Sequence, residues 1–328
     1  SRPSPTASVA VSVRQAIAPT SAAATATAAP GFGLPKSSLD GARETVLPVS
    51  MPVRTRDRIG LGSGEQLDCP GLVKRLCGGD PARFASVSRV ALDPWLRRLD
   101  ADACGVLRET TEALVRLDLV SRVPKSGAWA AYPYDAMFLL PSRLAQARSE
   151  FEGDGDDTDA RDALKVLDAL RAVLMPLWHK HGEPDPYYVL LRADGDRMGE
   201  LIDAAVQADA LDRLHEVTQA LARFAGGVTA TVRNHHGECI YAGGDDVLAF
   251  LPVDQALACA RRLHDDFGTS LAPVTRALNA DTPPTLSVGL AVQHCIEPLS
   301  AALARSHAAE KLAKGDGSQH TRDGLGIV

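Results

Sequence analysis

The chain lacks any run of about 18 consecutive apolar residues, so no segment of it is expected to cross a membrane. It also lacks a surplus of basic residues, because 35 Lys and Arg stand against 41 Asp and Glu and give a net charge of -6. Proteins that coat nucleic acid without sequence preference usually carry such a surplus, so this class is not favoured.

Cysteines are few, and none of them forms a CxxC pair. Cys239 and Cys259 lie in apolar segments, where a free thiol packs like a small hydrophobic side chain. No disulfide framework is indicated, so a cytoplasmic location is expected. The six cysteines are Cys69, Cys77, Cys104, Cys239, Cys259 and Cys295.

Several common enzyme motifs are also missing. The sequence contains no Walker phosphate loop, no GxSxG nucleophile elbow and no GxGxxG fingerprint. His264-Asp265 resembles a fragment of a metal phosphohydrolase signature, but the upstream His that this chemistry needs is absent. The acidic segment FEGDGDDTDA lacks the spacing of an EF-hand, so a solvated loop is favoured there.

The composition divides the chain into four parts. Residues 1–60 are rich in Ala, Ser, Thr and Pro, which favours a flexible low-complexity segment over a secretory signal. Residues 61–100 hold glycine-rich turns and a short helical pattern. Residues 101–183 carry leucines at three- and four-residue steps, which predicts a mostly helical domain. Residues 184–328 form the fourth part.

This fourth part alternates strands and helices. The apolar run YYVLLRA at 187–193 predicts a strand, and a long helical pattern follows it. Two short strands at 238–242 and 247–251 flank the residues GGDD. A helix, a strand at 285–292, a helix at 300–314 and a terminal strand complete the order. The order predicts an α+β fold of the ferredoxin-like βαββαβ type, with an antiparallel sheet backed by helices.

Three carboxylates are expected to meet in this sheet. Asp194 follows the first strand, and Asp245 and Asp246 lie in the turn between the next two. Because these strands are neighbours in the predicted sheet, Asp194 and Asp245 should converge. Phosphoryl transfer to a hydroxyl uses Mg²⁺ or Mn²⁺ ions held by such carboxylates, so we predict Asp194, Asp245 and Asp246 as catalytic and metal-binding residues. Asp196 is a lesser candidate, because the chain turns into a helix there.

Neighbouring residues are suited to bind a triphosphate. Gly243 and Gly244 permit positive φ in a short turn and leave no side chain between the backbone and a nucleotide. Lys311 and Lys314 end the last predicted helix and could reach the same phosphates. Taken alone, GGDD is also ordinary hairpin turn chemistry, so the prediction rests on the conjunction of the strand, the turn and the Lys-bearing helix.

The amino-acid sequences of these segments resemble a known family. ADGDRMGELI at 193–202, YAGGDDVLAFLP at 241–252 and HAAEKLAKG at 307–315 are similar to the second palm of the large subunit of type III CRISPR effector complexes, in the III-B (Cmr) branch. GEQLDCPGLVKRL at 64–76 and FASVSRVALDPWL at 84–96 resemble the region around the zinc-binding knob of that family. The resemblance spans about residues 61–328 and is densest from 186 onward.

The resemblance implies an antiviral function. In that family the GGDD palm, which is related to GGDEF and polymerase palms, converts ATP into cyclic oligoadenylate when the complex binds target RNA. Attack of a ribose 3′-hydroxyl on the α-phosphate expels pyrophosphate. The expected partners are therefore ATP, the other subunits of the complex and, through them, guide RNA and target RNA.

Two departures from the family pattern qualify this expectation. The zinc knob of the family has two cysteine pairs, whereas Cys69 and Cys77 alone occur in this region, which argues against zinc. The nuclease domain, the first palm and the C-terminal helical domain of the family are not recognised in the sequence. The family uses two palms to shape its site, so we expect this chain to need a partner or to be inactive alone.

Two other functions stay open. A diguanylate cyclase has the related GGDEF palm, but Asp246 stands here at its Glu position, and Met198-Gly199 stand where that family commonly has Phe-Lys. Such an enzyme would convert GTP. A non-catalytic assembly subunit would instead support complex formation without converting any nucleotide.

Overall fold

The computed structural model describes most of the chain from residue 84 onward and short stretches before it. Its residues form two compact units, Ser1–Pro81 and Ala82–Val328. The described residues are 35–38, 43–48, 61, 65–77, 84–125, 127–152, 158–207, 211–280, 282–315 and 322–328. Most of the segment predicted to be flexible, residues 1–60, lies outside them, and so does the centre of the acidic loop.

The first unit contains one described helix, α3 (Cys69–Cys77). The Asp68 carboxylate precedes this helix and accepts a hydrogen bond from Gly71 N at 2.9 Å, which caps the first turn. Leu47, Leu61 and Leu67 form a small buried cluster beside it. Cys69 is exposed, whereas the Cys77 side chain lies outside the described residues.

Helices make up the start of the second unit. Asp100 caps the long helix α6 by accepting a hydrogen bond from Ala103 N at 2.8 Å. Several leucines at three- and four-residue steps are buried, among them Leu107, Leu114 and Leu167, whereas Leu117 is 37% exposed. The α-helices of this part are α4 (Val87–Ala91), α5 (Asp93–Leu96), α6 (Ala101–Arg116), α7 (Pro141–Glu152) and α8 (Thr158–His181). Two 3₁₀ turns, η2 (Gly127–Trp129) and η3 (Met137–Leu139), lie between α6 and α7.

A five-stranded sheet forms the rest of the unit, with strand order β2-β3-β1-β4-β5. Neighbouring strands are antiparallel except β4 and β5, which are parallel. This arrangement confirms the predicted ferredoxin-like fold, in which the hairpin lies beside the first strand. The strands are β1 (Tyr187–Gly195), β2 (Glu238–Gly243), β3 (Asp246–Pro252), β4 (Leu286–His294) and β5 (Leu325–Ile327).

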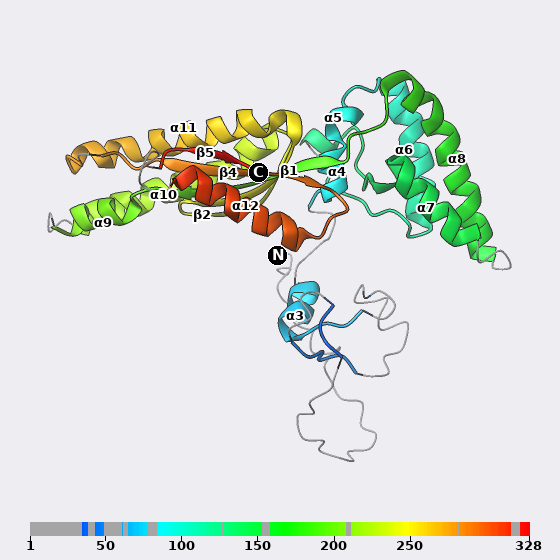
Figure 1. Cartoon of the computed structure of the whole chain (residues 1–328), viewed down its shortest axis with the longest axis horizontal. Helices are drawn as coiled ribbons and strands as arrows, with labels where there is room; N and C mark the ends of the chain where they lie inside the picture. The colour runs from blue at the N-terminus through cyan, green and yellow to red at the C-terminus, as the bar shows by residue number, and fades with distance from the viewer. Residues whose placement is uncertain are drawn as a thin grey trace, which may run out of the picture. The chain divides into compact units, whose positions relative to one another are not determined.

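Helices cover both faces of this sheet (Figure 1). Alternate β1 residues, such as Val189 and Leu191, share a core with Phe224 of α10 and Phe267 of α11, whose rings meet edge to face. The opposite face of β4 and β5 is covered by α12. The helices are α9 (Met198–Gln207), α10 (Leu211–Asn234), α11 (Val253–Ala277) and α12 (Leu299–Lys314).

Glycines allow α12 to lie close to the sheet. The buried side of the helix carries small residues, including Ala309 and Ala313. A Cβ built on Gly289 of β4 would lie 2.2 Å from the Glu310 backbone nitrogen, and one on Gly326 would lie 2.0 Å from the Ala309 carbonyl oxygen. Such distances leave no room for a side chain, so the two glycines allow the short packing distance between α12 and the sheet.

Replacing Gly289 by Ala is therefore expected to destabilise the protein. The added methyl group would meet backbone atoms of α12, which cannot rotate away, and overpacking of this kind costs about 1–3 kcal/mol. The free energy of unfolding in urea measures the effect. Gly268→Ala is the matched control, because a Cβ there meets nothing within 4 Å. Equal stability of the two variants would contradict the close packing.

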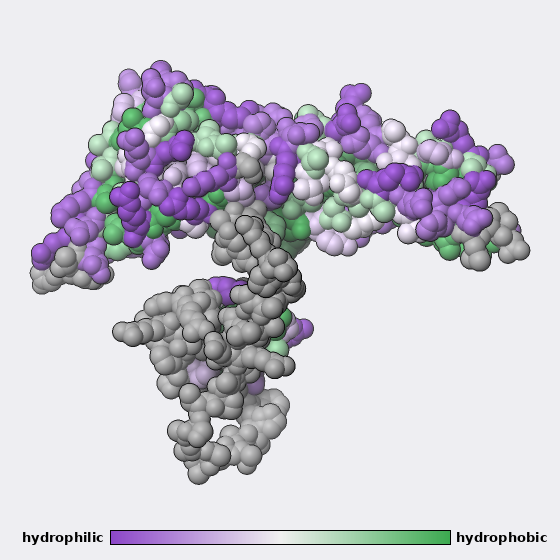
Figure 2. Space-filling view, turned by 180° about the vertical axis from the view of Figure 1, so that it is seen from behind, coloured by the Kyte–Doolittle hydropathy of each residue, from purple (hydrophilic) through white to green (hydrophobic). Residues whose placement is uncertain are grey.

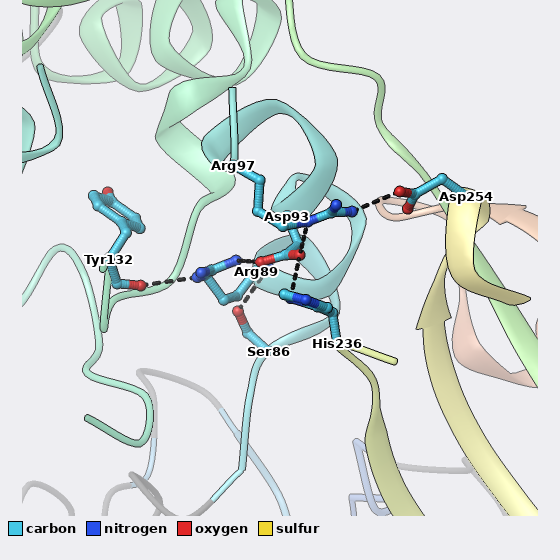
Figure 3. A network of polar contacts seen from close by, with 7 residues as sticks. All are labelled: Ser86, Arg89, Asp93, Arg97, Tyr132, His236 and Asp254. Carbon is cyan, nitrogen blue, oxygen red and sulfur yellow. Dashed lines mark hydrogen bonds and ion pairs between the residues drawn. The ribbon is translucent and has the colours of Figure 1, made fainter. Parts of the chain in front are cut away.

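A buried ion-pair network joins the helical part to the sheet part (Figure 3). Arg89 and Asp93 are 1% and 0% exposed, and Arg89 Nη1 donates to Asp93 Oδ1 at 2.8 Å. Arg97 Nε donates to Asp93 Oδ2 at 2.7 Å, and Arg97 Nη2 donates to Asp254 at the start of α11. His236 Nδ1, in the turn before β2, lies 3.1 Å from Asp93 Oδ2. One carboxylate thus links α4, α5 and the palm-like sheet.

The surface in Figure 2 carries polar residues interspersed with small apolar patches. Within the described ranges, no helix combines the length and the apolar character that crossing a bilayer requires. The predicted boundaries at residues 60, 100 and 183 remain a prediction. Contacts unite residues 101–183 and 184–328 in one compact unit.

Candidate active site

The end of β1 and the β2–β3 hairpin bring the predicted carboxylates together. Ala193 of β1 pairs with Val247 of β3, so Asp194 and Asp246 are the next residues along these two antiparallel strands. On its other side Asp194 pairs with Ser287 of β4. β1 continues to Gly195, two residues beyond the predicted strand, and this extension holds Asp194 within the sheet.

The hairpin turn consists of Gly244 and Asp245, because Gly243 and Asp246 pair as the last rung of the ladder. Gly244 has a φ of +68°, which L side chains rarely adopt. Gly243, in contrast, does not have a positive φ, so the prediction that both glycines serve this purpose is wrong for Gly243. A Cβ on Gly243 would lie 2.1 Å from Tyr241 Oη, but Tyr241 is 54% exposed and its ring can move away, so packing does not require a glycine there.

Asp245 reaches back over the end of β1. A Cβ on Gly195 would lie 2.7 Å from Asp245 Cβ and 3.0 Å from Asp245 Oδ2. The glycine after Asp194 therefore makes room for the second carboxylate. The structure brings Asp194, Asp245 and Asp246 together, as the strand order predicted.

Burial and crowding disfavour the charged forms of Asp245 and Asp246. Burial raises the pKa of Asp246 to about 6, and its hydrogen bond with Asp194 and the nearby charge of Asp245 add to the effect. Burial and the charge of Asp194 also raise the pKa of Asp245, whereas Lys314 lowers it. The folded protein thus holds negative charges close together, and a cation would relieve their repulsion.

Lys314 lies among these carboxylates, whereas Lys311 does not. The Lys314 ammonium donates to Asp194 Oδ2. Burial lowers the pKa of Lys314, but its hydrogen bonds to Asp194 and Glu310 outweigh that effect and raise it. Lys311 is exposed one turn earlier on α12, and no described hydrogen bond or ion pair joins it to the carboxylates.

Asp196 makes a separate set of hydrogen bonds, and no described hydrogen bond joins it to the three carboxylates. Its side chain is 0% exposed, and its Oδ2 accepts hydrogen bonds from Ser287 Oγ at 2.7 Å and Thr285 Oγ1 at 3.0 Å. The same oxygen accepts a hydrogen bond from Asp323 N at 3.1 Å. Asp196 therefore ties the end of β1 to β4 and to the turn before β5, which accounts for its acidic residue type.

The sequence analysis missed three side chains at the site, which are Arg192, Tyr241 and Glu310. Arg192, Tyr241 and Asp246 line a cavity of about 180 Å³ together with Leu248 of β3. Glu310 of α12 contacts Lys314 and is 6% exposed. The spacing carried a weak signal, because Arg192 stands two residues before Asp194 on a strand and Glu310 stands four before Lys314 on a helix.

The donor set suits a hard divalent cation. Mg²⁺ prefers oxygen ligands and commonly binds through one or two carboxylates, with water and phosphate completing its shell. Within the described residues, no group of three or more His, Cys, Asp and Glu side chains forms a ready-made metal cage. A site that water and a nucleotide complete does not require one, so the carboxylates fit Mg²⁺ or Mn²⁺.

Comparison with known proteins assigns a family to this part of the chain. The sequence profile described as the second palm domain of Cas10/Cmr2 matches residues 187–325. These residues belong to the Cas10/Cmr2 second palm domain family. The matched range contains β1 to β4, the GGDD turn and α12, so it includes the whole carboxylate group. The resemblance predicted from the Asp194 and GGDD segments is therefore confirmed.

Individual relatives agree with this assignment. The chain is 29% identical over 258 residues to the CRISPR system Cmr subunit Cmr2 of Pyrococcus furiosus, and the match covers 70% of this chain and 27% of that protein. The chain thus spans about a quarter of the length of this relative.

Two solved structures are also similar. A chain of a type III-B Cmr-beta complex in its apo state has a TM-score of 0.41 and 15% identity, over 78% of this chain and 37% of that one. The GGDEF domain of DgcB from Caulobacter crescentus, in complex with c-di-GMP, has a TM-score of 0.33 and 18% identity, over 43% of this chain and 77% of that one.

Proposed function

We propose that this chain is a subunit of a type III CRISPR effector complex and that its palm converts ATP into cyclic oligoadenylate. The observation that carries the proposal is the meeting of Asp194, Asp245 and Asp246 beside a glycine turn and Lys314, within a Cas10/Cmr2 second palm domain. The partners proposed are the other subunits of that complex and, through them, guide RNA and target RNA.

The residues of the site suit nucleotidyl transfer. Asp194 and Asp245 would hold the divalent cation, with Asp246 assisting. When bound, the cation favours loss of the proton from the attacking 3′-hydroxyl and offsets negative charge on the phosphates.

The turn and α12 would position the triphosphate. Gly244 carries no side chain, so phosphate oxygens can approach the backbone amides of the turn. Lys314 would exchange its contact with Asp194 for a phosphate oxygen once a cation binds that carboxylate. Binding energy from the phosphates would thus orient the α-phosphate toward the attacking hydroxyl.

Nucleotide conversion by the reconstituted complex tests this proposal. Labelled ATP or GTP is incubated with the complex, Mg²⁺ and target RNA, and the products are separated by chromatography. We expect cyclic oligoadenylate from ATP, no cyclic dinucleotide from GTP, and no product without target RNA. Conversion of GTP in place of ATP would favour a diguanylate cyclase. An assembled complex that converts neither nucleotide would favour a non-catalytic subunit.

A further inference from the structure

The register of β1 and β4 places a glycine beside Arg192. Arg192 pairs directly with Gly289, so both residues face the same side of the sheet, the side that α12 covers. Because Gly289 has no side chain, the backbone of Glu310 lies directly over it. The Glu310 carboxylate is therefore held next to the Arg192 guanidinium.

Two cations share this one buried carboxylate. Glu310 Oε2 lies 2.5 Å from Arg192 Nε, and Glu310 Oε1 lies 3.2 Å from Lys314 Nζ. His307 Nδ1 lies 3.6 Å from Oε2 on the outer side. Glu310 is 6% exposed, whereas the side chains of Arg192 and Lys314 are 40% and 29% exposed. The charged ends of both cations can thus meet a ligand while Glu310 stays covered.

Both cations also border the carboxylate group. Lys314 donates to Asp194, and Arg192 lines the 180 Å³ cavity with Asp246. The cavity opens beside the GGDD turn, where the proposed function places a nucleotide. Arg presents a rigid fork of donors that matches phosphate oxygens, and Lys adds a mobile point charge.

We propose that Glu310 is a positioning residue of this site and that Arg192 is a second phosphate-binding residue beside Lys314. The Glu310 carboxylate holds the two cations side by side, so that both meet the phosphates of one bound nucleotide. This inference rests on the proposed function, because it assumes that a nucleoside triphosphate binds at the GGDD turn.

Whether Glu310→Gln strengthens or weakens nucleotide binding distinguishes a positioning role of Glu310 from a simple effect of its negative charge. If Glu310 were merely a negative charge near the phosphates, Glu310→Gln would remove repulsion and tighten nucleotide binding. If Glu310 positions the cations, Glu310→Gln leaves Lys314 with Asp194 as its carboxylate partner and lets Arg192 turn toward Asp246, and nucleotide binding weakens. Gln has nearly the same shape as Glu and keeps an acceptor, so the packing of α12 is retained.

The experiment measures the Kd of α,β-methylene-ATP with Mg²⁺ by calorimetry on the reconstituted complex with target RNA. This analogue cannot release pyrophosphate, so binding is read without turnover. We expect Glu310→Gln and Arg192→Gln each to weaken binding by about 5- to 10-fold, the loss of a charge-assisted contact. Arg305→Gln is the matched control, since Arg305 also pairs with a Glu near α12 but lies away from the GGDD turn. It should bind as the wild type does.

A combined variant tests whether Glu310 acts through the cations. In a chain that already carries Arg192→Gln and Lys314→Gln, the further change Glu310→Gln is expected to alter the Kd by less than about twofold. Thermal melting of each variant reports folding. If Glu310→Gln does not fold, Arg192→Gln alone decides, because the Arg192 side chain is 40% exposed and its loss leaves the pair of Glu310 with Lys314.

Each outcome has one meaning. Tighter binding by Glu310→Gln, an unchanged Kd for Arg192→Gln, or a full additional loss in the combined variant would each overturn the inference. In all three cases wild-type binding of the analogue would leave the proposed function standing. No binding by the wild-type complex would overturn both.

Discussion

Replacement of Asp245 by Asn is expected to lower the rate of ATP conversion at least about 100-fold. The change removes one charged ligand from the proposed metal site. Loss of a residue that only supports a metal ligand already costs about 10- to 100-fold, so loss of a ligand itself should cost more. The rate is measured as product formed from labelled ATP by the reconstituted complex with target RNA and Mg²⁺.

The same replacement is expected to leave the melting temperature unchanged or slightly higher. Burial and the charge of Asp194 raise the pKa of Asp245, so its ionised form is less favourable in the folded chain than in the unfolded chain. That cost grows as the pH rises above the ordinary pKa of an Asp side chain, so it is present at neutral pH. Asn removes it. Loss of activity without loss of stability is typical of a residue kept for function.

Asp203→Asn is the matched control, because Asp203 is exposed on α9. This variant should retain the activity and the melting temperature of the wild type. Full activity of Asp245→Asn would show that GGDD is a hairpin turn without chemistry. A large drop in the melting temperature would instead assign Asp245 to the stability of the turn.

The strands and the carboxylate group could be predicted because they rest on local patterns. The apolar runs around GGDD and before Asp194 each fit a strand, and the ferredoxin-like order leaves one way to place the hairpin beside β1. Asp194 and Asp245 then lie at the same end of the sheet. Their catalytic role stays a prediction, whereas their meeting is a property of the fold.

The supporting contacts could not be predicted, because they depend on register and helix height. Arg192 reads as a polar residue in a strand and Glu310 as a polar residue in a helix, and neither pattern shows that they touch. Their contact requires both the pairing of Arg192 with Gly289 and the close approach of α12 at that glycine. Such contacts follow from the tertiary packing of segments more than 100 residues apart in sequence.

The ion-pair network around Asp93 could be predicted from the sequence only in part. Arg89, Asp93 and Arg97 stand at four-residue steps, a spacing that favours side-chain pairs on one face of a helix. The sequence could therefore have indicated the pairs themselves. It could not show that Arg89 and Asp93 are buried. Loss of one partner of an exposed ion pair changes the stability little, whereas loss of one partner of a buried pair costs several kcal/mol.

Replacement of Asp93 by Ala is expected to destabilise the protein by about 3–5 kcal/mol. Burial lowers the pKa of Arg89, and Asp93 is its main compensating charge, so the change leaves a cation in the interior without its partner. Tyr132 O and the Trp129 ring, 4.8 Å from Arg89 Cζ, remain as its contacts. The free energy of unfolding in urea measures the loss.

The exposed pair of Asp162 and Lys165 provides the control. Both side chains are more than half exposed, so Asp162→Ala should change the stability by about 0–1 kcal/mol. A double variant, Arg89→Met with Asp93→Leu, should lose less stability than Asp93→Ala, because apolar side chains replace both buried charges.

The contacts of this network also predict which strands lose local stability in Asp93→Ala. Asp93 contacts His236 before β2, and its partner Arg97 contacts Asp254 at the start of α11, so Asp93→Ala should loosen both ends of the hairpin that carries GGDD. Hydrogen exchange of the amides in β2 and β3 should then rise more than that in β4. Equal exchange in all three strands would mean that the buried pair stabilises the unit as a whole and does not hold the hairpin in particular.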